Sequence, residues 1–277
     1  MQGRRPVLIR ASSRRFSKRR LTRPAEESQG GSEVLRAVDV SKSYGGVVAL
    51  DGVTVSVCRG EVLALVGDNG AGKSTLVKIV SGVVRADKAE LYVLGNSVDI
   101  GSPAVARSLG IRTVHQEQKL AENLDVIENL FLGEELARWT GPLHMVDFNS
   151  MVRPTEVALS KLRITTIADI RTPVARLSGG QRQAVAVARA TLGQYRIVLL
   201  DEPTTGLSVE ASARVMDMVM QLREGGCAVV LVSQSIEEVF EVADRVAVLH
   251  HGRLAGVFAR AETTPEEVVT AVMGGQL

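Results

Sequence analysis

The chain has 277 residues, of which 45% are hydrophobic and 23% charged, and its formal net charge is +2. These proportions are those of a globular protein, and no window approaches the run of about 18 apolar residues that a membrane-spanning helix needs. Two cysteines are too few for a disulfide framework, so neither a membrane-spanning nor a disulfide-stapled protein fits. We expect any role at a membrane to come through a partner.

The start of the chain differs in charge from the remainder. Residues 1–25 contain nine basic residues and no acidic one, which leaves 24 basic and 31 acidic residues elsewhere, a net charge of −7. Such a tail could contact anionic lipid or nucleic acid, and its Arg- and Ser-rich composition is also typical of an organelle transit segment. A disordered extension, for example from an upstream start codon, is the simplest interpretation, and nucleic acid is the least favoured partner. We place the tail at 1–32 and the folded domain at 33–277.

A strand, a glycine-rich loop and a helix follow one another early in the folded domain. The β-type runs are 34–40, 53–57 and 61–66. The last run leads into a match to G-x-x-x-x-G-K-[ST], whose backbone N–H groups wrap a polyphosphate, and a helix is predicted over 73–81. The loop residues are Gly67, Asp68, Asn69, Gly70, Ala71, Gly72, Lys73 and Ser74. We expect Lys73 to reach the β- and γ-phosphates and the Ser74 hydroxyl to bind Mg²⁺.

The middle of the chain has a different pattern. Segments 126–132 and 155–162 suit helices, and no clear strand lies between them. We therefore expect residues 117–176 to form a helical subdomain inserted into the surrounding domain. No internal repeat is visible, so the sequence indicates one nucleotide-binding module.

Strands and helices alternate again toward the end of the chain. The predicted strands are 197–201, 228–232 and 246–249, and the predicted helices are 210–223 and 236–243. Near-continuous apolar strands alternating with helices predict an α/β fold, here a phosphate-loop NTPase core. Asp201 ends the first of these strands and is expected to hold Mg²⁺, while Glu202 is expected to polarise the attacking water. An Asp-Glu pair after a strand can also be an ordinary solvated turn.

Residues 177–181, Leu-Ser-Gly-Gly-Gln, place a serine and two glycines at the head of a predicted helix, where free N–H groups favour an anion. Because the sequence contains this pentapeptide in addition to the phosphate-loop motif, residues 33–277 resemble the ATP-binding subunits of ABC transporters. The resemblance implies an ATPase in which this signature of one subunit closes over the ATP held by the loop of another, in a head-to-tail homo- or heterodimer. The implied signature contacts are Ser178, Gly179, Gly180 and Gln181.

The same resemblance gives roles to residues outside the two motifs. Tyr44 is implied to stack on adenine, and a simple aromatic residue at a strand edge is the alternative. Gln116 corresponds to the glutamine that senses Mg²⁺ and couples to the membrane partner. Thr75, directly after the loop, completes the expected contacts to ATP. The implied cofactors are ATP and Mg²⁺, with Ser74, Gln116 and Asp201 as the metal set.

Four stretches look like the carbohydrate-importer branch of that family. They are residues 102–103, 110–117, 128–133 and 181–190. The resemblance implies ATP-driven import of a sugar or related small solute, with the chain peripheral on the cytoplasmic face of the cell membrane. The implied partners are a membrane permease, a second ATP-binding subunit and, indirectly, a solute-binding protein.

Two positions depart from the family pattern. Gln234 stands where the family usually has a histidine that contacts the γ-phosphate and the attacking water, and Ser208 stands where most members have an aspartate. A neutral amide donates a hydrogen bond without the help of a positive charge, so we expect slower hydrolysis by about tenfold with Glu202 still present. The alternative is a degenerate or regulatory subunit with weak turnover that pairs with another ATPase subunit.

Overall fold

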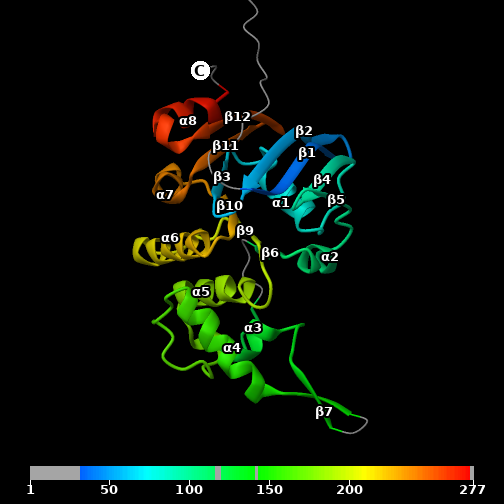
Figure 1. Ribbon diagram of the computed structural model, residues 1–277. Coiled ribbons are helices and arrows are strands. Elements are labelled where there is room, and N and C mark those ends of the chain that lie inside the picture. The colour runs from blue at the N-terminus through cyan, green and yellow to red at the C-terminus, as the bar shows by residue number, and fades with distance from the viewer. Residues whose placement is uncertain (1–31, 116–119, 141–142, 275–277) are drawn as a thin grey trace, which may run out of the picture. The chain divides into compact units, whose positions relative to one another are not determined.

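The computed structural model describes residues 32–115, 120–140 and 143–274. Residues 1–31 of the basic tail and Gln116 lie outside the described residues, so what was expected of them stays a prediction. Within the described ranges, a six-stranded sheet and a four-stranded sheet frame the phosphate loop, and helices cover the larger sheet (Figure 1).

The larger sheet has the strand order β12-β11-β3-β10-β9-β6. Its strands are β3 (Val62–Val66), β6 (Ile111–Val114), β9 (Ile197–Asp201), β10 (Ala228–Val232), β11 (Arg245–His250) and β12 (Arg253–Ala259). All neighbours pair in parallel except β12, which pairs antiparallel with β11. Every residue of β3, β9 and β10 is buried, as near-continuous apolar runs covered on both faces predict. The expected α/β fold is confirmed.

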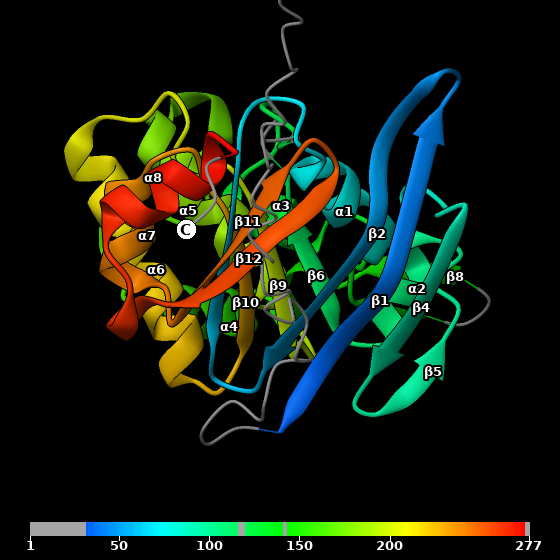
Figure 2. The ribbon, with the colours of Figure 1, turned by 90° about the horizontal axis from the view of Figure 1, so that it is seen from above.

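The smaller sheet is antiparallel, with the order β2-β1-β4-β5, and Figure 2 shows its strands side by side. Its strands are β1 (Glu33–Tyr44), β2 (Val47–Cys58), β4 (Lys88–Val93) and β5 (Asn96–Val98). The runs predicted at 34–40 and 53–57 are thus halves of one long hairpin outside the parallel sheet. The end of β1 and the start of β2, which lie next to the connecting turn, are largely exposed. Both twelve-residue strands therefore extend beyond their buried apolar residues.

Alternate residues of β3 point to opposite faces of the larger sheet, as in any strand. Leu63 and Leu65 join one apolar cluster with the smaller sheet and with α1 (Lys73–Val80), so α1 is packed between the two sheets. Val62, Ala64 and Val66 join the cluster of the opposite face, where most of the other helices pack. The loop between β3 and α1 is therefore anchored by a strand and a helix that are both buried.

The remaining helices are short to medium in length. They are α2 (Pro103–Ser108), α3 (Val126–Phe131), α4 (Phe148–Lys161), α5 (Gly179–Ala190), α6 (Val209–Glu224), α7 (Ile236–Val242) and α8 (Pro265–Val272), with 3₁₀ turns at Val174–Arg176 and Arg260–Glu262. In the described ranges no helix is both long and apolar enough to cross a bilayer. Both helices expected at 126–132 and 155–162 are present, although α4 begins seven residues earlier, at Phe148, after the capping residue Asp147.

The expectation that the middle segment contains no strand is wrong. Strands β7 (Ala137–Thr140) and β8 (Leu143–Val146) pair antiparallel between α3 and α4. Each strand has only four residues and no repeated alternation, so periodicity gives no signal at this length. The described residues between 117 and 176 thus contain helices and a small antiparallel strand pair, and their grouping into an inserted subdomain stays a prediction. Helix α5 also packs against α3 and α4, beyond the proposed boundary.

Candidate nucleotide-binding site

The loop between β3 and α1 needs glycine at specific positions. Gly67, Gly70 and Gly72 have φ angles of 147°, 82° and 105°. A Cβ atom on Gly67 would lie 2.1 Å from the carbonyl oxygen of Leu249, and one on Gly72 would lie 2.5 Å from that of Ala49. Because no atom of the part of the chain that the structure describes lies within 4 Å of a Cβ at Gly70, the φ angle is the reason for glycine there.

The exposed rim of this loop is formed by Asp68, Asn69 and Gly70, while Ala71 and Gly72 are buried. The Ala71 N–H donates to the Asp68 carbonyl at 3.1 Å, which closes the turn. Thr75, expected to contact ATP, lies half-buried in the first turn of α1. The sequence prediction of a strand, a tight loop and a helix is confirmed for the backbone; the contacts to ATP stay predictions.

Lys73 is the first residue of α1 and is 5% exposed. Its Nζ donates to the carbonyl oxygens of Gly67 at 2.6 Å and Asp68 at 2.9 Å, which hold the ammonium over the loop. Burial lowers the pKa of Lys73, and the negative charges of Glu202 and Asp201 oppose that shift. The loop thus holds a poorly solvated cation, which a phosphate would stabilise.

Ser74 and Asp201 form the second part of the site. The Ser74 hydroxyl donates to Asp201 Oδ1 at 3.2 Å, and Asp201 is 4% exposed at the end of β9. Burial raises the pKa of the Asp201 carboxyl, and the hydrogen bond from Ser74 opposes that shift. Mg²⁺ prefers hard oxygen ligands about 2.1 Å away, so neighbouring ligands of an octahedral ion are about 3 Å apart. The two oxygen donors fit an Mg²⁺ ion that they would share with phosphate oxygens.

Glu202 follows Asp201 in a strained backbone conformation, with a φ of 50°. Its N–H donates to the Val232 carbonyl at 2.9 Å, so the ladder between β9 and β10 continues one residue past Asp201. Its side chain is only 8% exposed, and Thr205 Oγ1 donates to Glu202 Oε2 at 3.2 Å. Positive φ at a buried acidic residue is the type of strain that structures retain at functional sites. An ordinary solvated turn does not describe this residue.

Gln234 lies in the loop that follows β10, and its side chain contacts the carboxylate of Glu202. Its Nε2 donates to Glu202 Oε1 at 2.7 Å, so both oxygens of Glu202 accept hydrogen bonds from neutral donors. The sequence placed Gln234 near the γ-phosphate and the water through the family resemblance alone. The contribution of Thr205 was not anticipated, because no motif pattern marks it.

Tyr44 ends β1 with 47% of its surface exposed, and Val47 and Val48 at the start of β2 are more exposed still. The strand register pairs Lys42 with Leu50 and Ser43 with Val48, which leaves Ala49 as a bulge. The Ala49 carbonyl is the group that approaches Gly72. The β1–β2 hairpin therefore passes beside the end of the phosphate loop at Ala49, and the exposed apolar surface farther along the hairpin is available for a flat base.

The Leu-Ser-Gly-Gly-Gln segment forms a well-defined helix start. Ser178 is the N-cap of α5: its Oγ accepts from the Gln181 N–H at 3.3 Å, and Gln181 Oε1 accepts from the Ser178 N–H at 2.9 Å. Gln181 Nε2 also donates to the Thr166 carbonyl at 2.7 Å. A Cβ on Gly180 would lie 2.9 Å from Ala211 Cβ, so Gly180 allows α5 to pack closely on α6. The predicted helix head is confirmed.

A groove of about 310 Å³ lies between the parallel sheet and the helical segment. Its walls come from β6, α2, α3 and α5, and they include His115, which precedes Gln116 in the sequence. Among the described residues, the charged side chains that line it are Arg107, Arg112, Glu134 and Arg189, so positive charge exceeds negative charge among these four. Arg112 donates from Nη2 to Glu134 at 3.2 Å, and Arg189 donates to the Leu132 carbonyl at 2.8 Å.

A phosphate loop leading out of a buried parallel strand, with an acidic pair at the same edge of the sheet, defines a phosphate-loop nucleoside triphosphatase. The sequence profile described as "ABC transporter" matches residues 50–205, more than half of the chain. The chain therefore belongs to the ABC transporter family, as an ATP-binding ATPase subunit.

Individual proteins agree with this assignment. The chain is 42% identical over 242 residues to the xylose/arabinose import ATP-binding protein XylG of Sulfolobus acidocaldarius, covering 87% of this chain and 94% of the relative. It is 38% identical over 218 residues to the fructose import ATP-binding protein FrcA of Rhizobium meliloti, covering 76% and 83%. An ATP-binding cassette solved in its ADP conformation, MJ1267, superposes with a TM-score of 0.72 at 26% identity, covering 87% and 95%.

Proposed function

We propose that this chain hydrolyses ATP to power the import of a sugar or related small solute through an ABC transporter. The observation that carries the proposal is the meeting of Lys73, the Ser74–Asp201 pair and Glu202 at one edge of the parallel sheet. The solute class follows from similarity to relatives named for import of xylose, arabinose and fructose. Both relatives are covered over most of their length, so the similarity is not limited to one motif.

The loop residues would bind the triphosphate through main-chain N–H groups and the Lys73 ammonium. Ser74 and Asp201 would hold Mg²⁺, which supplies charge neutralisation to the phosphates when bound. Burial lowers the pKa of Lys73 and raises that of Asp201, so it disfavours the charged form of each side chain. Binding of Mg·ATP would place an opposite charge next to each of them. The nucleotide is thus expected to stabilise the domain as well as to react.

Glu202 would accept a proton from the attacking water, or polarise it, because it is the buried carboxylate beside the Mg²⁺ pair. Gln234 and Thr205 would keep that carboxylate in place through their hydrogen bonds at 2.7 Å and 3.2 Å. Neither donor changes its charge between pH 5 and 9, so neither adds a titration of its own to the pH dependence of hydrolysis.

Completion of the site would require a second ATP-binding subunit. Figure 1 places α5 among α3 and α4, apart from α1 and the phosphate loop of the same chain. The N–H groups at the head of α5 would then cap the triphosphate of the partner subunit, and the partner would do the same in return. Such an arrangement makes the dimer, rather than the single chain, the hydrolysing unit.

The groove lined by Arg107, Arg112, Glu134 and Arg189 is the surface that we assign to the membrane permease, with Gln116 next to it in sequence. The groove includes residues of β6, and β6 pairs with β9, the strand that ends at Asp201. A movement of the groove would therefore be transmitted through two neighbouring strands to Ser74 and Asp201. Docking on this groove would keep the chain peripheral on the cytoplasmic face of the membrane. A solute-binding protein would act through the permease.

Two measurements test the proposal on the full chain. Purified wild-type protein should hydrolyse Mg·ATP, whereas Lys73→Ala should fail to bind it and Glu202→Gln should bind without turnover. Reconstitution into vesicles with an ABC sugar permease that copurifies with this chain should then give ATP-dependent uptake of labelled xylose, arabinose or fructose. Hydrolysis without uptake of any of these sugars would contradict the import of sugars while leaving the ATPase intact.

One observation favours the weak-turnover alternative. Gln234 stands where the family pattern has a histidine, and it donates a neutral hydrogen bond to Glu202. If the wild-type homodimer binds Mg·ATP tightly and hydrolyses it very slowly, and if a second ATP-binding subunit restores the rate, the chain is the regulatory half of a heterodimer.

A further inference from the structure

The Tyr44 ring, which the family resemblance places against adenine, is supported by neighbouring side chains. Lys42 lies two residues before Tyr44 on β1, on the same face of the strand. Its ammonium is 5.5 Å from the centroid of the Tyr44 ring, within the range of a cation–π contact. The Lys42 side chain is only 17% exposed, so the ammonium is held against the ring instead of extending into solvent.

Asp87, directly before β4, fixes that lysine. Lys42 Nζ donates to Asp87 Oδ1 at 2.7 Å, and the Ser43 N–H donates to Asp87 Oδ2 at 2.7 Å. The Asp87 N–H donates in turn to the Ser41 carbonyl at 2.9 Å. One carboxylate thus holds both the cation below Tyr44 and the backbone between Lys42 and Tyr44. The hydrogen bond from Lys42 lowers the pKa of Asp87, so the carboxylate stays charged.

We propose that Lys42 and Asp87 are positioning residues that set the Tyr44 ring for stacking on the nucleotide base. The cation occupies one face of the ring and leaves the other face for the base, beside the exposed Val47 and Val48. A ring held in place before binding loses less conformational freedom when the ligand arrives, which increases affinity. This inference rests on the proposed nucleotide binding and concerns only its base.

The test measures the Kd and KM of Mg·ATP, the kcat, and the inhibition constant of Mg·tripolyphosphate, a probe with no base. Lys42→Met should raise the Kd and KM of Mg·ATP about two- to fivefold, the size of an exposed cation–π contact. It should leave kcat and the tripolyphosphate constant unchanged. Lys42→Arg keeps the cation and should restore ATP affinity, and Asp87→Asn should resemble Lys42→Met.

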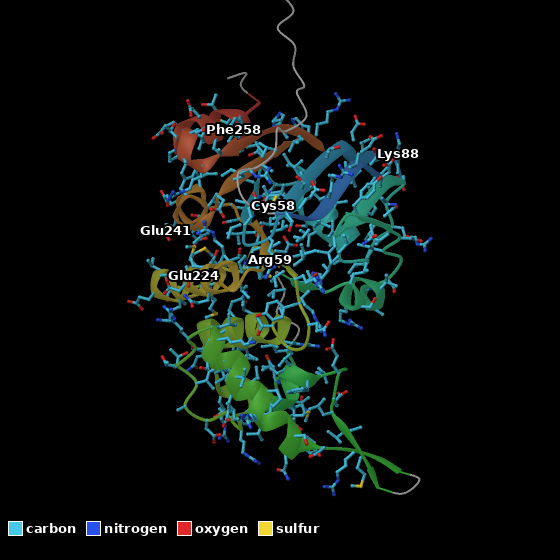
Figure 3. All side chains as sticks on the ribbon, in the orientation of Figure 1. Cys58, Arg59, Lys88, Glu224, Glu241 and Phe258 are labelled. Carbon is cyan, nitrogen blue, oxygen red and sulfur yellow. The ribbon has the colours of Figure 1, made fainter. Side chains whose placement is uncertain are left out.

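Lys88→Met is the matched control. Lys88 is the next residue after Asp87, at the start of β4 in the smaller sheet (Figure 3), and its ammonium pairs with Asp39 on β1. Its removal deletes a neighbouring positive charge without touching the Tyr44 support, so the ATP affinity should match that of the wild type.

The outcomes distinguish failure of the proposed nucleotide binding from failure of the proposed Tyr44 support. A wild-type chain that does not bind Mg·ATP overturns the proposed function itself. Tyr44→Ala should raise the Kd about fivefold to a hundredfold, as loss of base stacking does; an unchanged Kd would place the base elsewhere and overturn the inference. The inference also fails if Lys42→Met behaves like the wild type or like Lys88→Met, or if the tripolyphosphate constant rises in parallel with the Kd of ATP.

Discussion

Gln234 donates a 2.7 Å hydrogen bond from Nε2 to Oε1 of Glu202, and thereby ties the loop after β10 to the residue after β9. Thr205 Oγ1 donates to the other oxygen at 3.2 Å. The Glu202 carboxylate therefore accepts hydrogen bonds from two neutral donors, one on each oxygen. Substitutions at residue 234 should separate the effect of position from the effect of charge.

We expect Gln234→His to raise kcat about tenfold at neutral pH, because an imidazolium beside Glu202 adds charge assistance to the phosphate contact. The variant should also gain a decline in kcat as pH rises through the pKa of the new histidine, between about pH 6 and 8. The wild-type profile should lack that decline. Gln234→Met keeps the volume and removes the donor, and it should lower kcat. Equal pH profiles for the wild type and Gln234→His would contradict the idea that charge at this position limits the rate.

Glu202→Gln should reduce kcat by a factor of about 10² to 10⁴, the typical effect of losing a general base, while Mg·ATP binding persists. Glu238→Gln is the control, since Glu238 is a nearby carboxylate at the start of α7 that accepts a hydrogen bond from Thr204 at 2.7 Å. Steady-state hydrolysis and calorimetric binding give the two quantities. A similar loss of kcat in both variants would assign the effect to general disturbance of the loop.

The most buried strands were predictable from the sequence to within a residue. The strands over 197–201 and 228–232 have the predicted bounds, because each is a run of apolar residues ended by polar ones. The smaller sheet was not predicted as a separate layer. The bulge at Ala49 and the pairing of β1 with β4 are decided by packing around α1, which lies outside any local window.

The residues expected to bind and hydrolyse ATP were more predictable from the sequence than the residues that hold them in place. The pattern around Lys73 and Ser74 and the acid pair Asp201–Glu202 were expected, and the structure brings Ser74 and Asp201 together across 127 positions. The contacts of Lys42 with Asp87 were not expected, because they link different strands through side chains that match no motif. Gly180 was expected for its N–H group, whereas its close packing on α6 could only come from three-dimensional contacts.

Asp201→Asn should stabilise the nucleotide-free protein at pH 7 and weaken its response to Mg·ATP. Burial raises the folded-state pKa of Asp201, so its contribution to stability is present below the ordinary value of 3.8 and is lost as pH rises through the raised value. At neutral pH the ionised carboxylate thus costs stability, and asparagine removes that charge at nearly the same size. Thermal unfolding should give a higher Tm for the variant without nucleotide and a smaller rise with Mg·ATP.

The control for that comparison is Asp217→Asn, on an exposed position of α6. It should leave both the Tm and the response to Mg·ATP unchanged. A Tm for Asp201→Asn below that of the wild type would show that the carboxylate contributes more through Ser74 and Lys73 than its burial costs.

Two glycines of the phosphate loop should respond differently to alanine. Gly67→Ala places a methyl group 2.1 Å from the Leu249 carbonyl at a φ of 147°, so the loop and β11 must separate. Gly70→Ala meets no atom of residues 32–115, 120–140 and 143–274 within 4 Å, and it bears the strain of a φ of 82°, about 1–2 kcal/mol. Urea unfolding should show the larger loss of stability for Gly67→Ala. Equal losses would mean that the clash is relieved at no cost.

Adjacent glycines of the signature should separate stability from activity. Gly180→Ala places a methyl group 2.9 Å from Ala211 Cβ and should lower the free energy of unfolding by about 1–3 kcal/mol, the usual cost of overpacking. Gly179→Ala meets Leu207 Cδ2 at 3.5 Å, an ordinary contact, so the fold should keep its stability. Its methyl group would instead sit at the helix head that faces the partner's nucleotide, and kcat should fall. Urea unfolding and ATP hydrolysis are to be measured on both variants. If the signature acts only through packing, the Gly179→Ala enzyme will stay fully active.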